Sequence, residues 1–168
     1  MVILGIDPGY AIVGYGVVQM QNSRYRPLEH GAITTKAAQE FSVRLEVIYD
    51  AMRAILHKWK PDAVAIERLF FNNNQKTAIQ VAEARGVILL AVQQARVPIA
   101  EYTPLQVKQA VTGYGQAKKA QVMEMTKRLL CLAQMPKLDD TCDALAMAIC
   151  HGQAAGSALR RTMLTGRL

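Results

Sequence analysis

The sequence predicts an α/β fold, in which a five-stranded mixed sheet carries helices on both faces. Three strand-like segments come first, helix and strand patterns then alternate, and helices end the chain. Of the 168 residues, 51% are apolar and 20% are charged, which is enough to form a core and unlike a disordered chain. No repeat or low-complexity linker divides residues 1–152, so we expect a single domain there and a flexible basic tail over 153–168.

The expected strands are short apolar segments bounded by turn residues. The first runs into Asp7-Pro8-Gly9, and its connection to the second is short enough for a hairpin. The third contains Pro27, which predicts an edge strand or an interruption. The strands are expected at residues 2–7, 12–20, 24–35, 62–67 and 97–102.

The expected helices show apolar residues spaced three and four apart. The first includes Phe41 and stops before Pro61, and Pro104 suits the first turn of a later one. Further helices are expected at residues 76–95, 117–132 and 139–151. The helix over 76–95 is apolar on more than one face. It fits either an internal helix of a monomer or a helix that also meets its copy across a two-fold axis.

Composition and charge exclude several classes of protein. No secretory signal is visible before Asp7, and the longest apolar run, 87–92, is far too short to cross a membrane. The three cysteines form no Cys-x-x-Cys pair, so we expect reduced thiols in a cytoplasmic protein. The net charge is +7, and residues 105–137 hold six basic residues and one acidic residue. Such a segment suits a polyanion, with nucleic acid first and an acidic membrane second.

Four acidic residues fall where they could form one site. Asp7 and Glu67 end two strands, at the edge where sites of open α/β sheets gather. Asp140 and Asp143 are three residues apart, so a helix places both on one face. Carboxylates brought together raise one another's pKa values, and a pair of Mg²⁺ ions would remove that cost and support phosphodiester hydrolysis.

Each of these acids also has a structural explanation. Asp7-Pro8-Gly9 alone is ordinary turn chemistry, and Asp139 with Asp140 could cap a helix and interact with its dipole. Spacing to Asp143 does not distinguish Asp139 from Asp140. The functional explanation is favoured because strand-end acids, a helical acid pair and a basic segment just upstream occur together.

A series of motifs extends from about residue 2 to residue 151. They are Ile6-Asp7-Pro8-Gly9, Gly14-Tyr15-Gly16-Val17, Ala65-Ile66-Glu67, Phe70-Phe71, Asn74, Ala84-Arg85-Gly86, Glu101-Tyr102-Thr103-Pro104, Val107-Lys108 and Asp140-Thr141-Cys142-Asp143-Ala144-Leu145-Ala146. In this order they resemble the RuvC-type Holliday junction endonucleases. The resemblance implies a ribonuclease H-like fold. It also implies catalytic and metal-binding acids at Asp7, Glu67, Asp140 and Asp143, and the family's Asp-x-x-Asp-Ala-Leu-Ala pattern is what selects Asp140 over Asp139.

The resemblance further implies an activity and partners. These are paired symmetric nicks in a four-way DNA junction, two Mg²⁺ ions per active site for which Mn²⁺ could substitute, a homodimer, and branch-migration helicase proteins as partners. Three other functions stay open. They are a ribonuclease H-like nuclease acting on structured RNA, a non-catalytic junction-binding module, and an ATP-binding phosphotransfer domain, for which the chain supplies only about one of two lobes.

Two aromatic residues and an asparagine are candidate DNA contacts. Phe70 and Phe71 are each either core residues or rings that stack on an unpaired base, and the resemblance favours stacking for Phe70. Asn74 could touch a phosphate or a base edge.

The remaining candidates are basic. Lys108, Lys118 and Lys119 either belong to a solvated face or contact phosphates, and the scarcity of acids around them favours phosphates. The resemblance points most directly to Lys108 and Lys119. Arg85 fits a DNA contact or a structural ion pair equally well.

Overall fold

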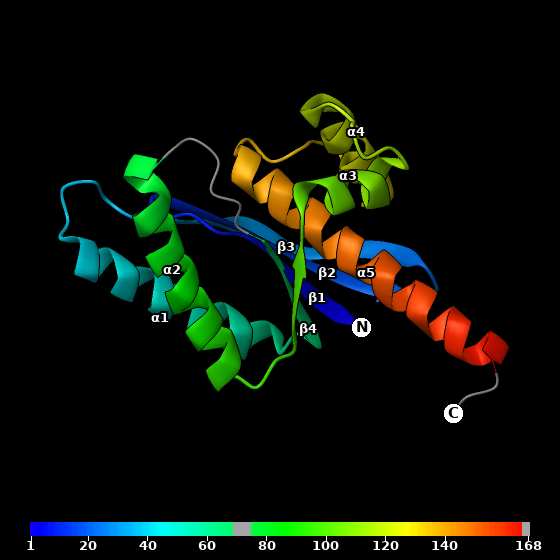
Figure 1. Cartoon of the computed structure of the whole chain (residues 1–168), viewed down its shortest axis with the longest axis horizontal. Coiled ribbons are helices and arrows are strands. Elements are labelled where there is room, and N and C mark those ends of the chain that lie inside the picture. Colours follow the sequence, from blue (N-terminus) through cyan, green and yellow to red (C-terminus); the bar gives the residue numbers. More distant parts are fainter. Residues whose placement is uncertain (69–74, 166–168) are drawn as a thin grey trace.

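A computed structural model of the chain describes residues 1–68 and 75–165, and the side chains of 1–68 and 77–157. The described residues form one five-stranded mixed sheet and five helices, which confirms the predicted fold class (Figure 1). The strands are β1 (Val2–Asp7), β2 (Ile12–Gln21), β3 (Arg24–Thr34), β4 (Ala63–Glu67) and β5 (Ile99–Tyr102).

The sheet has the order β3-β2-β1-β4-β5. The first three strands form an antiparallel meander, and β4 and β5 run parallel to β1. The carboxyl ends of β1, β4 and β5 therefore meet at one edge of the sheet. Pro27 lies on the edge strand β3, where the register with β2 shifts between Val17 and Val18, so its missing N–H is tolerated as expected.

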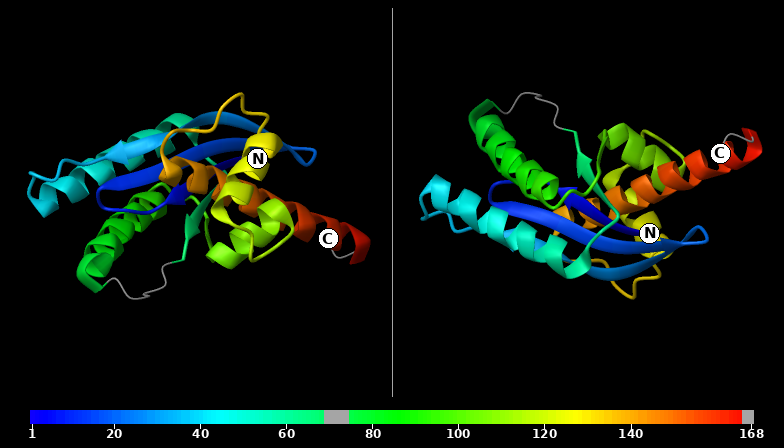
Figure 2. Two further views of the ribbon diagram at one scale, coloured as in Figure 1. Left: turned by 90° about the horizontal axis from the view of Figure 1, so that it is seen from above. Right: turned by 90° about the horizontal axis from the view of Figure 1, so that it is seen from below.

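Helices cover both faces of the sheet. Their bounds are α1 (Phe41–Trp59), α2 (Gln75–Gln94), α3 (Pro104–Thr112), α4 (Lys119–Leu129) and α5 (Asp139–Thr165). Helices α1 and α2 lie on one face, and α5 lies on the other with α3 and α4 outside it (Figures 1 and 2). Each face has its own core of buried apolar side chains.

The strand pleat decides which side chains of β1 and β4 face each core. Leu4 and Ile6 of β1 belong to the core under α1 and α2, whereas Ile3 belongs to the core under α5. In β4, Ile66 faces α1 and α2 and Ala65 faces α5. Since alternate residues of a strand share a face, Asp7 at the end of β1 and Glu67 at the end of β4 both point to the α5 side.

The last helix is longer than the sequence analysis predicted. Its expected end was His151, but α5 continues to Thr165, and this end projects beyond the sheet (Figures 1 and 2). Residues 152–165 contain no proline, so the helical backbone can continue through the two glycines, Gly152 and Gly156. None of the helices in the described part of the chain is both long and apolar enough to cross a membrane.

Candidate active site

Asp7 and Glu67 lie side by side at the carboxyl edge of the sheet. The parallel register pairs Ile6 with Ile66, so the next residue of each strand is one of these two acids. Both side chains point to the α5 side of the sheet, and a side-chain hydrogen bond joins them. The strands thus bring together two carboxylates that are sixty residues apart in the chain.

Two glycines bring α5 against this edge. Gly14 of β2 pairs with Asp7, and a Cβ at Gly14 would lie 2.0 Å from the backbone oxygen of Asp140. A Cβ at Gly5 would lie 2.0 Å from the backbone oxygen of Ala144. Both positions require glycine because the helix backbone fills the space of a side chain. The first turns of α5 therefore lie directly over the end of β1.

The four acids interact electrostatically at this place. Burial, together with the smaller effect of the charges of Glu67, Asp143 and Asp140, raises the pKa of Asp7 to about 8. Burial also raises the pKa of Glu67, with a second contribution from Asp143. Asp7 and Glu67 therefore keep their protons to higher pH than isolated carboxyl groups do. Asp139 does not contribute to either shift, and its side chain points to a lysine instead.

That lysine is Lys119, the first residue of α4. Its Nζ lies 3.1 Å from Asp143 Oδ2 and 3.1 Å from Asp139 Oδ2. Burial alone would lower the pKa of Lys119, but the two carboxylates outweigh burial and raise it. Lys119 is thus a cation already bound to one of the four acids.

A cavity of about 240 Å³ opens beside these groups. Its charged lining consists of two acids, Glu67 and Asp143, and two lysines, Lys108 and Lys119. Apolar side chains complete the wall, namely Pro104, Val107, Val122 and Met147. The arrangement can receive an anionic group between the lysines and present it to the carboxylates. Among the described residues, no three Asp, Glu, His or Cys side chains form a group that could hold a metal ion as they stand.

Comparison with known proteins gives the family. Residues 3–151 match the family model of the crossover junction endodeoxyribonuclease RuvC. The chain belongs to the RuvC family.

Relatives of similar length share about half of their residues with this RuvC-family chain. The crossover junction endodeoxyribonuclease RuvC of Halothermothrix orenii is 56% identical over 154 residues, which cover 92% of this chain and 93% of the relative. RuvC of Brevibacillus brevis is 55% identical over 153 residues, covering 91% and 92% of the two chains. The structure of Thermus thermophilus RuvC in complex with Holliday junction substrate has a TM-score of 0.90 at 36% identity, covering 94% of this chain and 96% of that one. A yeast mitochondrial Holliday junction resolvase, 13% identical with a TM-score of 0.65, shares the fold.

Arg85 of α2 has a structural role in this RuvC-family fold. Its side chain is only 14% exposed, Nη2 lies 3.1 Å from Glu101 Oε1, and Nε donates a hydrogen bond to the backbone oxygen of Glu67 at 3.3 Å. Of the two explanations that the sequence left open, the structure favours the ion pair. Sequence reasoning assigned no role to Glu101, although an acid on a short strand beside Glu67 was a signal.

The other predicted DNA contacts differ in where they lie. Lys118 precedes α4 and is exposed, outside the residues that line the cavity. Phe70, Phe71 and Asn74 lie outside the residues that the structure describes, so their contacts stay predictions.

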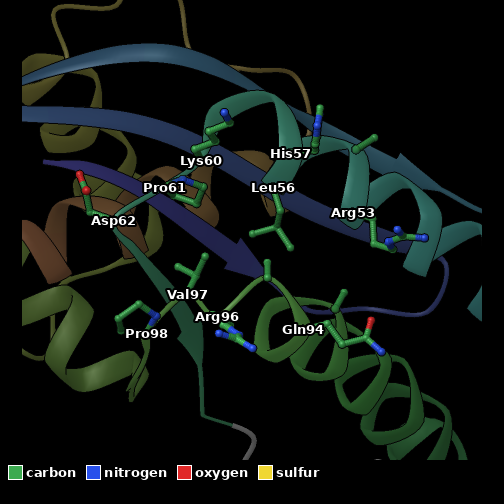
Figure 3. A pocket seen from close by; sticks show the side chains of 13 residues that line it. Arg53, Leu56, His57, Lys60, Pro61, Asp62, Gln94, Arg96, Val97 and Pro98 are labelled. Atoms are coloured by element: carbon green, nitrogen blue, oxygen red, sulfur yellow. The ribbon is translucent and has the colours of Figure 1, made fainter.

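A second cavity, of about 860 Å³, lies at the opposite edge of the sheet (Figure 3). Its basic lining consists of Arg53 and His57 of α1, Lys60 at the end of that helix, and Arg96 just after α2. Lys60 and Arg96 adopt left-handed φ values of 43° and 57°, where the two helices end. Helix carboxyl ends carry partial negative charge, which these cations offset. Lys60 and Arg96 thus have a structural role at the helix ends.

Proposed function

We propose that this RuvC-family chain is a Mg²⁺-dependent, structure-selective DNA endonuclease. It resolves four-way (Holliday) junctions in homologous recombination and repair by paired symmetric nicks. The proposal is carried by the burial of Asp7 among three further carboxylates, which raises its pKa to about 8. A largely buried acid beside further carboxylates is costly for a fold and typical of a functional site. The 36% identical Thermus thermophilus RuvC was solved with Holliday junction substrate, which supports the same substrate here.

The acid cluster suits divalent cations in its chemistry. Asp7, Glu67, Asp140 and Asp143 supply only carboxylate oxygens, the donors that Mg²⁺ prefers, and Mn²⁺ accepts the same ligands. Their mutual repulsion, visible in the raised pKa of Asp7, is a cost that bound cations would remove. Held by these four carboxylates, a pair of such ions would supply activation of a water molecule and stabilisation of the leaving oxygen of the phosphodiester.

The chain's own residues would position the DNA backbone. In the proposal, Lys108 and Lys119 line the cavity and bind phosphates, while Lys118 contributes from the exposed start of α4. Lys119 is bound to Asp143, so it must exchange this carboxylate for a phosphate when cations and DNA arrive. Phe70, Phe71 and Asn74 are proposed to contact unpaired bases and the backbone at the junction centre.

A homodimer is part of the proposal, because two cuts related by symmetry need two active sites. One face of α2 supports it. Ile79, Glu83, Gly86 and Leu90 are exposed and spaced to share a face, and Ile79 and Leu90 are 69% and 53% exposed. Replacement Leu90→Glu should convert a dimer to a monomer in light scattering after gel filtration. Branch-migration helicase proteins stay a proposed partner on the family resemblance alone.

The decisive experiment is cleavage of a mobile synthetic four-way DNA junction. With Mg²⁺, the protein should nick two opposite strands symmetrically, as resolved on a denaturing gel, and should leave linear duplex intact. Asp7→Asn and Glu67→Gln should abolish nicking and keep junction binding. A four-way RNA junction tests the nuclease on structured RNA, and preferential cutting of that RNA would contradict the proposal. Junction binding without any nicking would instead indicate a non-catalytic module.

A further inference from the structure

One peptide group at the end of β4 is held from both sides. It joins Glu67 to Arg68. Its oxygen, which belongs to Glu67, accepts a hydrogen bond from Arg85 Nε at 3.3 Å. Its N–H, which belongs to Arg68, donates to the backbone oxygen of Tyr102 in β5 at 2.8 Å. The backbone that carries the Glu67 side chain is thereby fixed just beyond the last strand residue, where a chain leaving a sheet would otherwise be free to rotate.

Glu101 holds the arginine that makes the first of these bonds. Its Oε1 lies 3.1 Å from Arg85 Nη2, and its Oε2 lies 3.5 Å from Arg68 Nε. The Arg85 contact is an ion pair without directed hydrogen-bond geometry, because Nη2 has no hydrogen-bond partner among the described residues. A buried guanidinium needs an oppositely charged partner, since desolvating its charge is costly. Glu101 thus offsets the charge of Arg85 while Arg85 Nε bonds the backbone oxygen of Glu67.

We propose that Arg85 and Glu101 form a positioning pair that sets the orientation of the Glu67 carboxylate for metal binding and cleavage. Arg85 reaches only the backbone of Glu67, so it acts through that residue and is not itself catalytic. The inference rests on the proposed function, in which Glu67 is a metal-binding acid. The pair also ties α2 to the ends of β4 and β5, which already pair with each other in the sheet.

The test is Arg85→Met in the full-length protein, with Mn²⁺ binding measured by electron paramagnetic resonance of the free ion. Removing a cation near four acids should by itself tighten Mn²⁺ binding. Loss of positioning should instead weaken it, about tenfold or more, as is usual for a residue that orients a ligand. The rate constant kcat for junction cleavage should fall by a similar factor, whereas KM and junction affinity without metal should stay within about twofold.

Three further variants keep the inference falsifiable. Arg85→Lys retains the charge and should recover part of kcat and of Mn²⁺ affinity, while Glu101→Gln should weaken both even if Arg85→Met fails to fold. Arg53→Met, an exposed arginine on α1 remote from the acids, is the matched control and should leave both unchanged.

The outcomes separate the inference from the proposed function. Unchanged or tighter Mn²⁺ binding with normal kcat in folded Arg85→Met and Glu101→Gln, while Glu67→Gln is inactive, overturns the positioning pair alone. Normal cleavage by Glu67→Gln overturns the proposed function and, with it, the inference.

Discussion

The backbone oxygen of Asp140 occupies the place where a side chain on Gly14 would lie. A Cβ at Gly14 would be 2.0 Å from that oxygen, and Gly14 is the β2 partner of Asp7. Gly14 therefore lets the start of α5 lie against β2 beside Asp7, and so helps to set the separation of Asp7 from the helical acids.

Gly14→Ala should separate α5 from the sheet. The new methyl group meets backbone, which cannot rotate away, so we expect a loss of about 1–3 kcal/mol in the free energy of unfolding. Cleavage should fall more than stability alone explains, because Asp140 and Asp143 move with the helix. Chemical denaturation and junction cleavage measure the two effects.

The control is Gly156→Ala in α5, where a Cβ meets nothing within 4 Å. It should stabilise the protein by about 0.5–1 kcal/mol, because alanine favours a helix interior over glycine. Equal stability of the two variants would show that the contact between Gly14 and Asp140 does not control the site.

Metal-free protein should lose stability as pH rises from about 4 to about 8. The pKa of Asp7 is raised by burial and by neighbouring acids from 3.8 to about 8 in the folded state. Between these values the folded protein binds more protons than the unfolded chain, so unfolding becomes easier with rising pH. Asp7→Asn should remove much of this slope and stabilise the protein at pH 8 by at least about 1 kcal/mol, or roughly 2–4 °C in Tm.

Thermal unfolding in EDTA across this pH range measures the effect, with Asp50→Asn as an exposed control on α1. The control should follow the parent protein at every pH. A parent Tm that is flat or rises over the window would contradict the buried acid cluster.

Divalent cations should oppose this loss of stability at high pH. A ligand that binds only the folded state raises Tm according to its concentration relative to Kd. Protons compete for the same carboxylates, so Mg²⁺ or Mn²⁺ should raise Tm more at pH 8 than at pH 6. Calorimetry with and without each ion measures this. Equal shifts in the parent protein and in Asp7→Asn would place the bound ion elsewhere.

Lys119→Met should weaken junction binding through the loss of one phosphate contact. The slope of log K against log salt concentration should decrease in magnitude by about one, and the weakening should be similar for junctions of different sequence. Fluorescence anisotropy over a salt series measures the slope.

The control for this variant is Lys58→Met, which removes a lysine that pairs with Glu29 on the other side of the sheet. Its salt slope should equal that of the parent protein. An unchanged slope in Lys119→Met would mean that Lys119 serves only as an ion-pair partner of Asp139 and Asp143.

The strand-end acids could be predicted from the sequence because local pattern determines them. An apolar run that ends in Asp7-Pro8-Gly9 or in Glu67 marks both the strand and its end. The parallel sheet then brings these ends together. The choice of Asp140 over Asp139 follows from the family motif and stays a prediction. Asp140, and not Asp139, contributes to the raised pKa of Asp7.

The tertiary contacts could not be predicted in the same way. Nothing in the basic segment indicates that Lys119 pairs with Asp139 and Asp143, because that depends on how α4 packs against α5. The extension of α5 from His151 to Thr165 is also not predicted, because the small, polar and basic residues from Gly152 onward are typical of a loose tail. Helix propensity penalises glycine only modestly, so it does not determine where a helix ends.

The most direct test of the account is the position of bound Mn²⁺ in crystals of the protein, found from its anomalous scattering. We expect Mn²⁺ between the carboxylates of Asp7, Glu67, Asp140 and Asp143, with Lys119 displaced from Asp143, and no ion there in Asp7→Asn. Anomalous density absent from these carboxylates, at a Mn²⁺ concentration that supports junction cleavage, would contradict it.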